Sequence, residues 1–263
     1  MGTVYSKDGT AIAFDRSGEG TPLILVDGAM CYRGFGPMGD LVPKLAPHFT
    51  VFSYDRRGRG ESGDTLPYAV EREIEDLDAL IQEAGGSAFV YGISSGAALS
   101  LAATASGLVI KKLALYEPPF NLDEGTRAQS LASLAQLRRL SAEDRRGEMV
   151  EAFMTQVGLP AEAISQMRNA PSWPMMEALA PTLAYDLTIL GDGSLPRGRA
   201  SSISIPTLVM AGGAGWPWML DSTQELASAI PNAQYRVLEG QTHEVAADAI
   251  APALIEFFIH TVL

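Results

Sequence analysis

The chain has one cysteine, three histidines and fewer basic than acidic residues, and these shortages exclude several classes of protein. A single cysteine, Cys31, excludes an internal disulfide and a metal site built from cysteines. With 19 Lys and Arg against 31 Asp and Glu, the formal net charge is −12. Nucleic acid is therefore not expected as a partner, because phosphate binding requires a basic face. No run of 18 apolar residues occurs, so we expect no membrane-spanning helix and no membrane partner.

The N-terminal residues also lack the basic and then apolar segments of an export signal, which favours a cytoplasmic protein. Residues 1–6 do match the pattern for N-terminal lipidation. No polybasic patch or second acylation site follows, however, and one acyl chain anchors a protein only marginally. We therefore expect Val4 and Tyr5 to belong to a β-hairpin that turns at Asp8 and Gly9.

The composition that is present, 47% hydrophobic and 19% charged, is that of an ordinary globular protein. Short apolar runs alternate with segments of helical periodicity. This alternation predicts an α/β fold, with a mostly parallel, twisted sheet and helices on both faces. We expect strands at residues 3–6, 11–16, 23–26, 50–54, 88–91, 112–116, 205–211 and 235–238, and helices at 68–84, 220–230 and 246–262.

Residues 120–199 differ from the rest, because they contain helical runs and no strand-like run. We expect them to form a helical cap, inserted after the strand that ends near Glu117. Residues 1–119 and 200–263 would then form the core domain. Within the insertion, residues 141–144 fit a capping box, which predicts that a helix begins there.

Residues 88–106 pass from a buried-strand run, through the G-x-S-x-G motif of residues 92–96, into an Ala/Leu-rich helical run. Strand, tight turn and helix form the context in which this motif presents a nucleophilic serine, here Ser94. The free N–H groups and the positive dipole end of the helix would face the same point, where they can hold an oxyanion. On spacing alone, the motif is also compatible with a Gly/Ser-rich turn that has no catalytic role.

Residues 58–63 spell G-x-G-x-x-G directly after a strand, a pattern found in dinucleotide sites. In those sites a helix opens immediately beneath the glycines, and an acidic residue ends a strand about 20 residues further on. Here residues 64–67 separate the glycines from the next helix, and no such acidic residue follows. We interpret the segment as a tight, charged turn, and we expect neither a cofactor nor a metal.

Over essentially its whole length, the chain resembles the α/β-hydrolase superfamily. Residues 92–96 resemble the nucleophile elbow, and residues 240–243, Gly-Gln-Thr-His, resemble the catalytic-histidine loop after the last strand. Residues 55–62 resemble the family's D-x-R-G-x-G-x-S turn. The insertion after Glu117 lies where the family carries its cap.

The resemblance implies roles for individual residues. Ser94 would be the nucleophile and His243 the base, while the backbone N–H groups of Ala29 and Ser95 would hold the oxyanion. The family usually has His-Gly where this chain has Asp27 and Gly28, but backbone donors do not depend on that side chain.

The other two histidines are poor candidates for the base, because His48 lies in a connector and His260 in the last helix. Cys31 follows residues 27–30, which we call the oxyanion loop, and no nucleophile elbow surrounds it. We therefore expect it to be packed rather than reactive.

The carboxylate that would complete a catalytic triad with Ser94 and His243 is not at the family's usual place. Residues 212–218, after the strand at 205–211, contain no carboxylate. Three candidates lie near the same sheet edge. Glu117 is preferred, because it ends the strand after the nucleophile helix, where some dehalogenases and lipases of the superfamily carry the acid. Asp221 lies slightly past the usual place, and Asp27 lies in the oxyanion loop, where its charge would oppose an oxyanion.

The resemblance therefore implies a serine hydrolase that cleaves a small, largely apolar ester, lactone or thioester. We expect Met30, Trp173, Tyr185 and Trp216 to line its pocket, although each is compatible with ordinary core packing. Two alternatives stay open: a cofactor-free lyase, cyclase or oxygenase of secondary metabolism, or a ligand-binding module that has lost catalysis. In each case the partner is a small molecule, and the sequence does not decide between a monomer and a homodimer.

Overall fold

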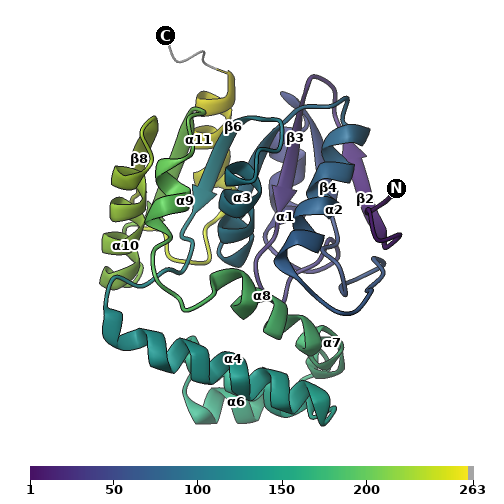
Figure 1. The fold of residues 1–263 in the computed structure, drawn as a ribbon, viewed down its shortest axis with the longest axis vertical. Coiled ribbons are helices and arrows are strands. Elements are labelled where there is room, and N and C mark those ends of the chain that lie inside the picture. Colours follow the sequence, from purple (N-terminus) through teal and green to yellow (C-terminus); the bar gives the residue numbers. More distant parts are fainter. Residues whose placement is uncertain (260–263) are drawn as a thin grey trace.

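A twisted sheet forms the centre of the molecule. The computed structural model describes residues 1–259, so His260 lies outside the described part. Within it, eight strands run in the order β1-β2-β4-β3-β5-β6-β7-β8 (Figure 1). The pairs β1/β2 and β2/β4 are antiparallel and the other pairs are parallel, so the sheet is mostly parallel, as predicted. The strands are β1 (Gly2–Tyr5), β2 (Ala11–Ser17), β3 (Thr21–Val26), β4 (Phe49–Tyr54), β5 (Ala88–Ile93), β6 (Ile110–Tyr116), β7 (Thr207–Gly212) and β8 (Ala233–Leu238).

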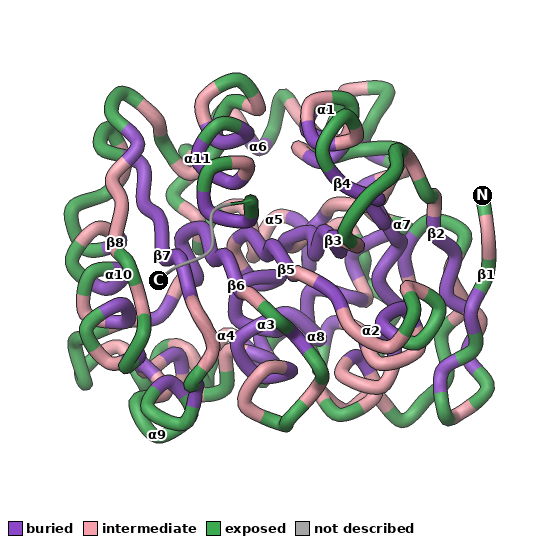
Figure 2. Tube along the Cα trace, turned by 90° about the horizontal axis from the view of Figure 1, so that it is seen from above, coloured by how far each residue is buried: buried purple, intermediate pink, exposed green. Residues whose placement is uncertain are grey.

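Helices cover both faces of the sheet, and strand β3 shows why. Leu23 and Leu25 pack into the core beneath α1 and α11, whereas Ile24 and Val26 pack into the core beneath α2 and α3. Each such side chain gains about 1.5–3 kcal/mol from burial, so a strand that is apolar on both faces needs a helix on each. Figure 2 shows the buried strands between the helices on the two faces of the sheet. These helices are α1 (Met38–Leu45), α2 (Val70–Glu83), α3 (Ser95–Ala105), α9 (Arg197–Ser201), α10 (Pro217–Ala229) and α11 (Ala247–Ile259).

A further group of helices, which we call the helical layer, lies beyond the carboxyl ends of the parallel strands, below the sheet in Figure 1. Its chain enters and leaves at one place, because Asn121 pairs with Ser194 and the Asn121 N–H donates to the Gly193 carbonyl at 2.7 Å. The layer has its own hydrophobic core, which includes Leu137 and Met149. It consists of η1 (Glu124–Thr126), α4 (Arg127–Ala142), α5 (Arg146–Gln156), α6 (Ala161–Arg168), α7 (Trp173–Leu179), η2 (Ala180–Thr182) and α8 (Leu183–Leu190).

The predicted capping box was wrong. Ser141 lies in the last turn of α4, where Leu137 and Leu140 continue that helix's buried face. Asp144 adopts a φ of 51° and belongs to the link between the helices. Helix α5 begins at Arg146 without a side-chain cap. The packing of α4 therefore overrides a local signal worth only about 1 kcal/mol.

None of the helices in residues 1–259 combines the length and the apolar character needed to cross a bilayer.

Candidate active site

Ser94 lies in the sharp turn between β5 and α3. Its φ of 56° falls in the left-handed region that residues with a Cβ rarely adopt. Two hydrogen bonds hold the turn: the Ser94 N–H donates to the Tyr116 carbonyl of β6 at 2.9 Å, and the Ser94 carbonyl accepts from the Ala97 N–H at 3.0 Å. Strained backbone of this kind persists only where its surroundings hold it in place. The turn leaves Ser94 partly exposed at the carboxyl edge of the sheet.

The N-terminus of α3 packs directly against the loop that follows β3. A Cβ on Gly96 would lie 2.3 Å from the Val26 carbonyl oxygen and 2.4 Å from that of Asp27. A Cβ on Gly28 would lie 3.0 Å from the Ser94 Cβ. Only glycine permits this approach, which brings the loop after β3 and the first turn of α3 together beside Ser94.

Two backbone N–H groups are available at this junction. Within residues 1–259, neither the N–H of Ala29 nor that of Ser95 donates a hydrogen bond to another protein group. Ser95 opens α3, where the first N–H groups lack intrahelical acceptors and carry the positive end of the helix dipole. The junction therefore has donors suited to an anionic oxygen.

Glu117 and His243 meet at the same edge of the sheet. The His243 Nδ1 lies 2.7 Å from Oε2 of Glu117, and the Gly212 N–H donates to Oε1 at 2.7 Å. Glu117 is fully buried, at the end of β6, with a φ of 44°. Since an ionised carboxylate only accepts hydrogen bonds, this contact assigns the histidine proton to Nδ1 and leaves Nε2 free to accept one.

The loop that carries His243 packs against the ends of β6 and β7. The Tyr116 hydroxyl donates to the Thr242 carbonyl at 2.5 Å, and a Cβ on Gly212 would lie 2.5 Å from the Gln241 carbonyl oxygen. His243 itself is 28% exposed, so its ring is open to an incoming molecule. The ends of β6 and β7 thus fix both the carboxylate and the imidazole.

The other two candidate acids lie elsewhere. Asp221 is exposed on α10, and within residues 1–259 it makes no hydrogen bond or ion pair with His243. Asp27 is buried, and its Oδ1 has no hydrogen-bond partner in the described chain. Of the three, Glu117 alone contacts the histidine.

Burial raises the pKa of Asp27 to about 7, although the charges of Arg59 and Arg56 oppose the rise. The nearby charge of Asp55 adds to it. Burial likewise raises the pKa of the Cys31 thiol to about 12, with Asp27 contributing. A thiol of such high pKa is a poor nucleophile at neutral pH. Within residues 1–259 no group of three His, Cys, Asp or Glu side chains is arranged to hold a metal ion.

The four residues expected to line a pocket occupy three different places. Met30, with a φ of 60°, and Trp173 are buried in the core of the helical layer. Trp216 is 44% exposed, with its ring centroid 6.1 Å from that of His243. Tyr185 instead stacks on Tyr68 at 3.8 Å, and its hydroxyl donates to Asp64 at 2.8 Å. It joins α8 to the segment before α2, so its hydroxyl is already engaged.

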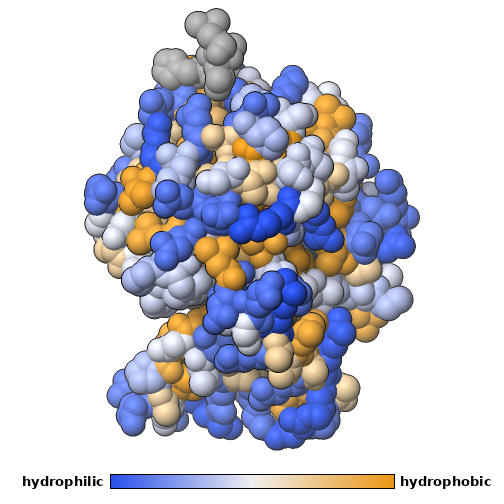
Figure 3. Space-filling model, turned by 60° about the vertical axis from the view of Figure 1, so that its left-hand side comes forward, coloured by the Kyte–Doolittle hydropathy of each residue, from blue (hydrophilic) through white to orange (hydrophobic). Residues whose placement is uncertain are grey.

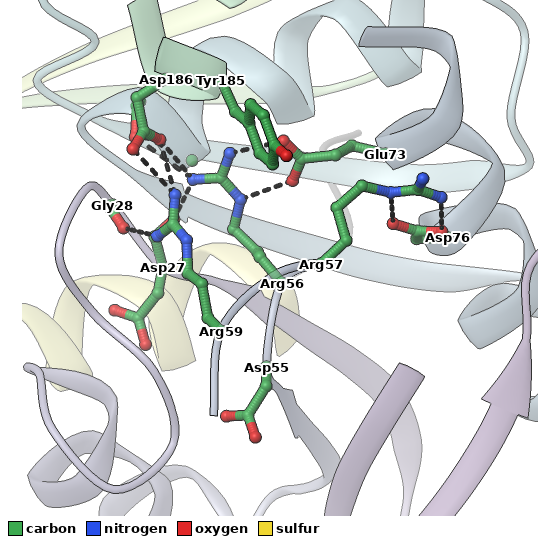
Figure 4. Close-up of polar contacts among 12 residues, drawn as sticks. Asp27, Gly28, Asp55, Arg56, Arg57, Arg59, Glu73, Asp76, Tyr185 and Asp186 are labelled. Carbon is green, nitrogen blue, oxygen red and sulfur yellow. Dashed lines mark hydrogen bonds and ion pairs between the residues drawn. The ribbon is translucent and has the colours of Figure 1, made fainter. Parts of the chain in front are cut away.

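Sequence reasoning missed a buried ionic cluster beneath the site, formed by Arg56, Arg59, Glu73 and Asp186 (Figure 4). Both arginines reach the Asp186 carboxylate on α8, with N–O distances of 2.8 Å. Arg56 also makes a bidentate pair with Glu73, at 2.7 and 2.9 Å. The signal in the sequence was Asp186, the single charged residue in the mostly apolar run of residues 183–190.

Comparisons with known proteins agree with this fold. A model of the alpha/beta hydrolase family matches residues 12–253. An alpha/beta hydrolase from Sphaerobacter thermophilus is 56% identical, with a TM-score of 0.88 over 98% of this chain and 100% of that one. An esterase from Thermogutta terrifontis is 21% identical (TM-score 0.72, 98% and 97% covered). An enol-lactonase from Burkholderia xenovorans is also 21% identical (TM-score 0.73, 98% and 100% covered). At that identity the last two show a shared fold.

The buried carboxyl of Asp27 leads to a prediction about stability. Folding raises its pKa from 3.8 to about 7, so the stability that neutral Asp27 provides is complete below about pH 4 and lost as the pH rises to about 7. Asp27→Asn cannot ionise and should avoid that loss. Its melting temperature should match that of the wild type near pH 4 and exceed it by several degrees at pH 8, since about 1 kcal/mol shifts a chain of this size by roughly 2–4 °C.

Thermal unfolding followed by circular dichroism from pH 4 to pH 8 checks this. The exposed Asp221→Asn is the control, because its carboxylate meets water in both the folded and the unfolded chain. A constant difference between Asp27→Asn and wild type across this range would contradict the prediction.

Proposed function

The chain belongs to the alpha/beta hydrolase family, and on that premise we propose that it is a serine hydrolase that cleaves a small, largely apolar ester, lactone or thioester. The observation that carries the proposal is the 2.7 Å contact between the His243 Nδ1 and the buried Glu117, at the sheet edge that presents Ser94. A buried carboxylate, an imidazole and a serine on a strained turn are the parts that acyl transfer requires.

In the proposed mechanism, the Ser94 Oγ attacks the substrate carbonyl carbon while the His243 Nε2 takes the hydroxyl proton. The Glu117 carboxylate stabilises the imidazolium and holds the ring orientation. The N–H groups of Ala29 and Ser95 donate to the oxyanion of the tetrahedral intermediate. His243 then protonates the leaving group, and a water molecule, deprotonated by His243, releases the acyl group from Ser94.

Within residues 1–259 no hydrogen bond joins the Ser94 Oγ to His243. Such bonds are often long in the absence of substrate and shorten when substrate binds. The absence of this bond is therefore compatible with the proposed proton transfer.

The surroundings of His243 support an apolar or aromatic substrate. Trp216 lies beside the histidine and stacks on Trp218 with ring centroids 6.3 Å apart, and both tryptophans are more than two-fifths exposed. Figure 3 shows hydrophobic surface at the narrowing between the core and the helical layer. Aromatic faces of this kind bind planar or apolar groups. The esterase and the enol-lactonase that share the fold act, by their names, on the same classes of bond.

We propose residues 120–199 as the cap over this site. Their helical layer lies beyond the carboxyl ends of the parallel strands, where ligands bind in folds of this type (Figure 1). Met30, in the loop after β3, packs among the side chains of the layer, together with Trp173. Substrate would therefore meet the layer and the reacting groups together.

The lack of an acid in residues 212–218 is a reason to consider a non-hydrolytic enzyme on the same fold. With Glu117 bonded to His243, that reason no longer favours it. It becomes one outcome of the test below.

Ser94→Ala should abolish turnover of p-nitrophenyl esters and leave the fold intact, because only the attacking oxygen is removed. Wild-type protein should hydrolyse the ester and be labelled at Ser94 by a fluorophosphonate, as seen by peptide mass spectrometry. Labelling without hydrolysis would favour a non-hydrolytic enzyme. No labelling would favour a ligand-binding module, and full activity of Ser94→Ala would contradict the proposed nucleophile.

Glu117→Gln should lower kcat by about 100-fold or more, since a neutral amide stabilises neither the imidazolium nor the required tautomer. The variant keeps an oxygen for the Gly212 N–H, so the melting temperature should change much less than the rate. Asp221→Asn is the matched control and should retain wild-type kcat. A larger loss in Asp221→Asn than in Glu117→Gln would show that the acid is assigned to the wrong residue.

A further inference from the structure

We propose that Arg59, held by Asp186, is a positioning residue that orients the peptide between Gly28 and Ala29 so that its N–H faces the reaction centre. This inference rests on the proposed serine hydrolase function. It deepens that function by naming what holds the oxyanion donors in place, a task that none of the three reacting side chains performs.

Arg59 acts on the peptide unit that contains the Ala29 N–H. In a planar trans peptide the C=O and the N–H point in opposite directions. The Gly28 carbonyl and the Ala29 N–H belong to the same unit, so a partner that fixes the carbonyl also fixes the direction of the donor. That partner is Arg59, whose Nη1 donates to the Gly28 carbonyl oxygen.

Arg59 also holds the turn that follows this peptide unit. The Arg59 Nη1 also donates to the Cys31 carbonyl at 3.3 Å. The two carbonyls that it contacts therefore flank Met30, whose φ of 60° is strained for a residue with a Cβ. Strain of this kind needs surroundings that hold it. One guanidinium group thus holds both sides of the strained turn that contains the donor.

Arg59 is itself held by Asp186. Its Nη2 contacts both carboxylate oxygens of Asp186, each at 2.8 Å (Figure 4). The same carboxylate accepts a hydrogen bond from the Ser95 Oγ at 2.7 Å, and Ser95 carries the second proposed donor. Arg56 adds a contact from its Nη1 to Asp186 at 2.8 Å and one to the Asp27 carbonyl at 3.2 Å. One carboxylate from α8 therefore ties both oxyanion donors to the helical layer.

The cluster is also suited to this task electrostatically. Arg56, Arg59 and Asp186 are almost completely buried, so water does not compete for their hydrogen bonds. A cationic donor on a carbonyl draws electron density from the peptide, which makes the N–H of that peptide a stronger donor. Arg59 thus both aims and strengthens the Ala29 N–H.

Arg57, two positions before Arg59, provides a matched control. Arg57 is equally buried and equally well paired, with contacts of 2.7 and 2.8 Å to Asp76 and 2.9 Å to Asp8. Its side chain points away from the loop after β3 in Figure 4, and none of its hydrogen bonds in the described chain reaches residues 27–31. Loss of Arg57 therefore reports what removing a buried guanidinium does to the fold alone.

The test compares Arg59→Met with Arg57→Met in the full-length protein. We expect both variants to melt at lower temperature than wild type. Arg59→Met alone should lower kcat for a p-nitrophenyl ester, by about 10- to 100-fold, with KM changed less than about twofold, because the donor acts mainly in the transition state. Labelling of Ser94 by a fluorophosphonate should slow to a similar degree. Arg59→Lys should recover part of the rate, since an ammonium can still donate to the Gly28 carbonyl.

The remaining outcomes separate this inference from the proposed function. Equal kcat losses in Arg59→Met and Arg57→Met, or no loss in either, would overturn the positioning role while wild-type labelling of Ser94 still supported the hydrolase. If Arg59→Met does not fold, Asp186→Asn provides the same test, and wild-type kcat in that variant would overturn the inference. If wild-type protein neither hydrolyses the ester nor is labelled at Ser94, the proposed function fails, and this inference with it.

Discussion

Two arginine side chains without access to water, Arg56 and Arg59, impose the constraint on which the arrangement of the molecule depends. An unpaired buried charge costs several kcal/mol, so the fold must place anions beside both. Glu73 comes from α2, but Asp186 has to come from the helical layer. The charges of Arg59 and Arg56 outweigh burial and hold the pKa of Asp186 below its ordinary value, so it stays ionised. The position of the layer over the sheet is therefore specified by charge as well as by apolar packing.

The relocation of the acid has a consequence for the neighbouring loop. Strands β6 and β7 are adjacent and parallel, so their carboxyl ends lie only about 5 Å apart. A carboxylate on the longer side chain of Glu117 reaches the imidazole from β6. The loop after β7 needs no acid, and it carries Trp216 beside His243 instead, stacked on Trp218 at the start of α10. A carboxylate at the end of β6 in place of one after β7 thus leaves room for both the contact with the imidazole and an aromatic surface.

Much of this could be predicted from residues close together in the sequence. The strands, the turn at Ser94 and the position of Glu117 at a strand end all follow from local pattern. Asp186 could not be predicted, because its partner Arg56 lies 130 positions away and no local pattern links them. Tyr185 illustrates the same limit: its aromatic character suggested a pocket, but its place is set by stacking on Tyr68.

The ends of the helical layer meet at Asn121 and Ser194, so the layer leaves and rejoins the core at one point. In evolutionary terms, such a segment can be exchanged without disturbing the strand order. Its two ends already lie side by side, so a replacement requires no change in the sheet. Asp186 limits that freedom. A replacement segment of any length or shape would have to present a carboxylate to Arg59, or the core would be left with an uncompensated cation, since Glu73 pairs with Arg56 alone. The length and shape of this part of the molecule can therefore vary during evolution, whereas the carboxylate at the position of Asp186 has to be kept.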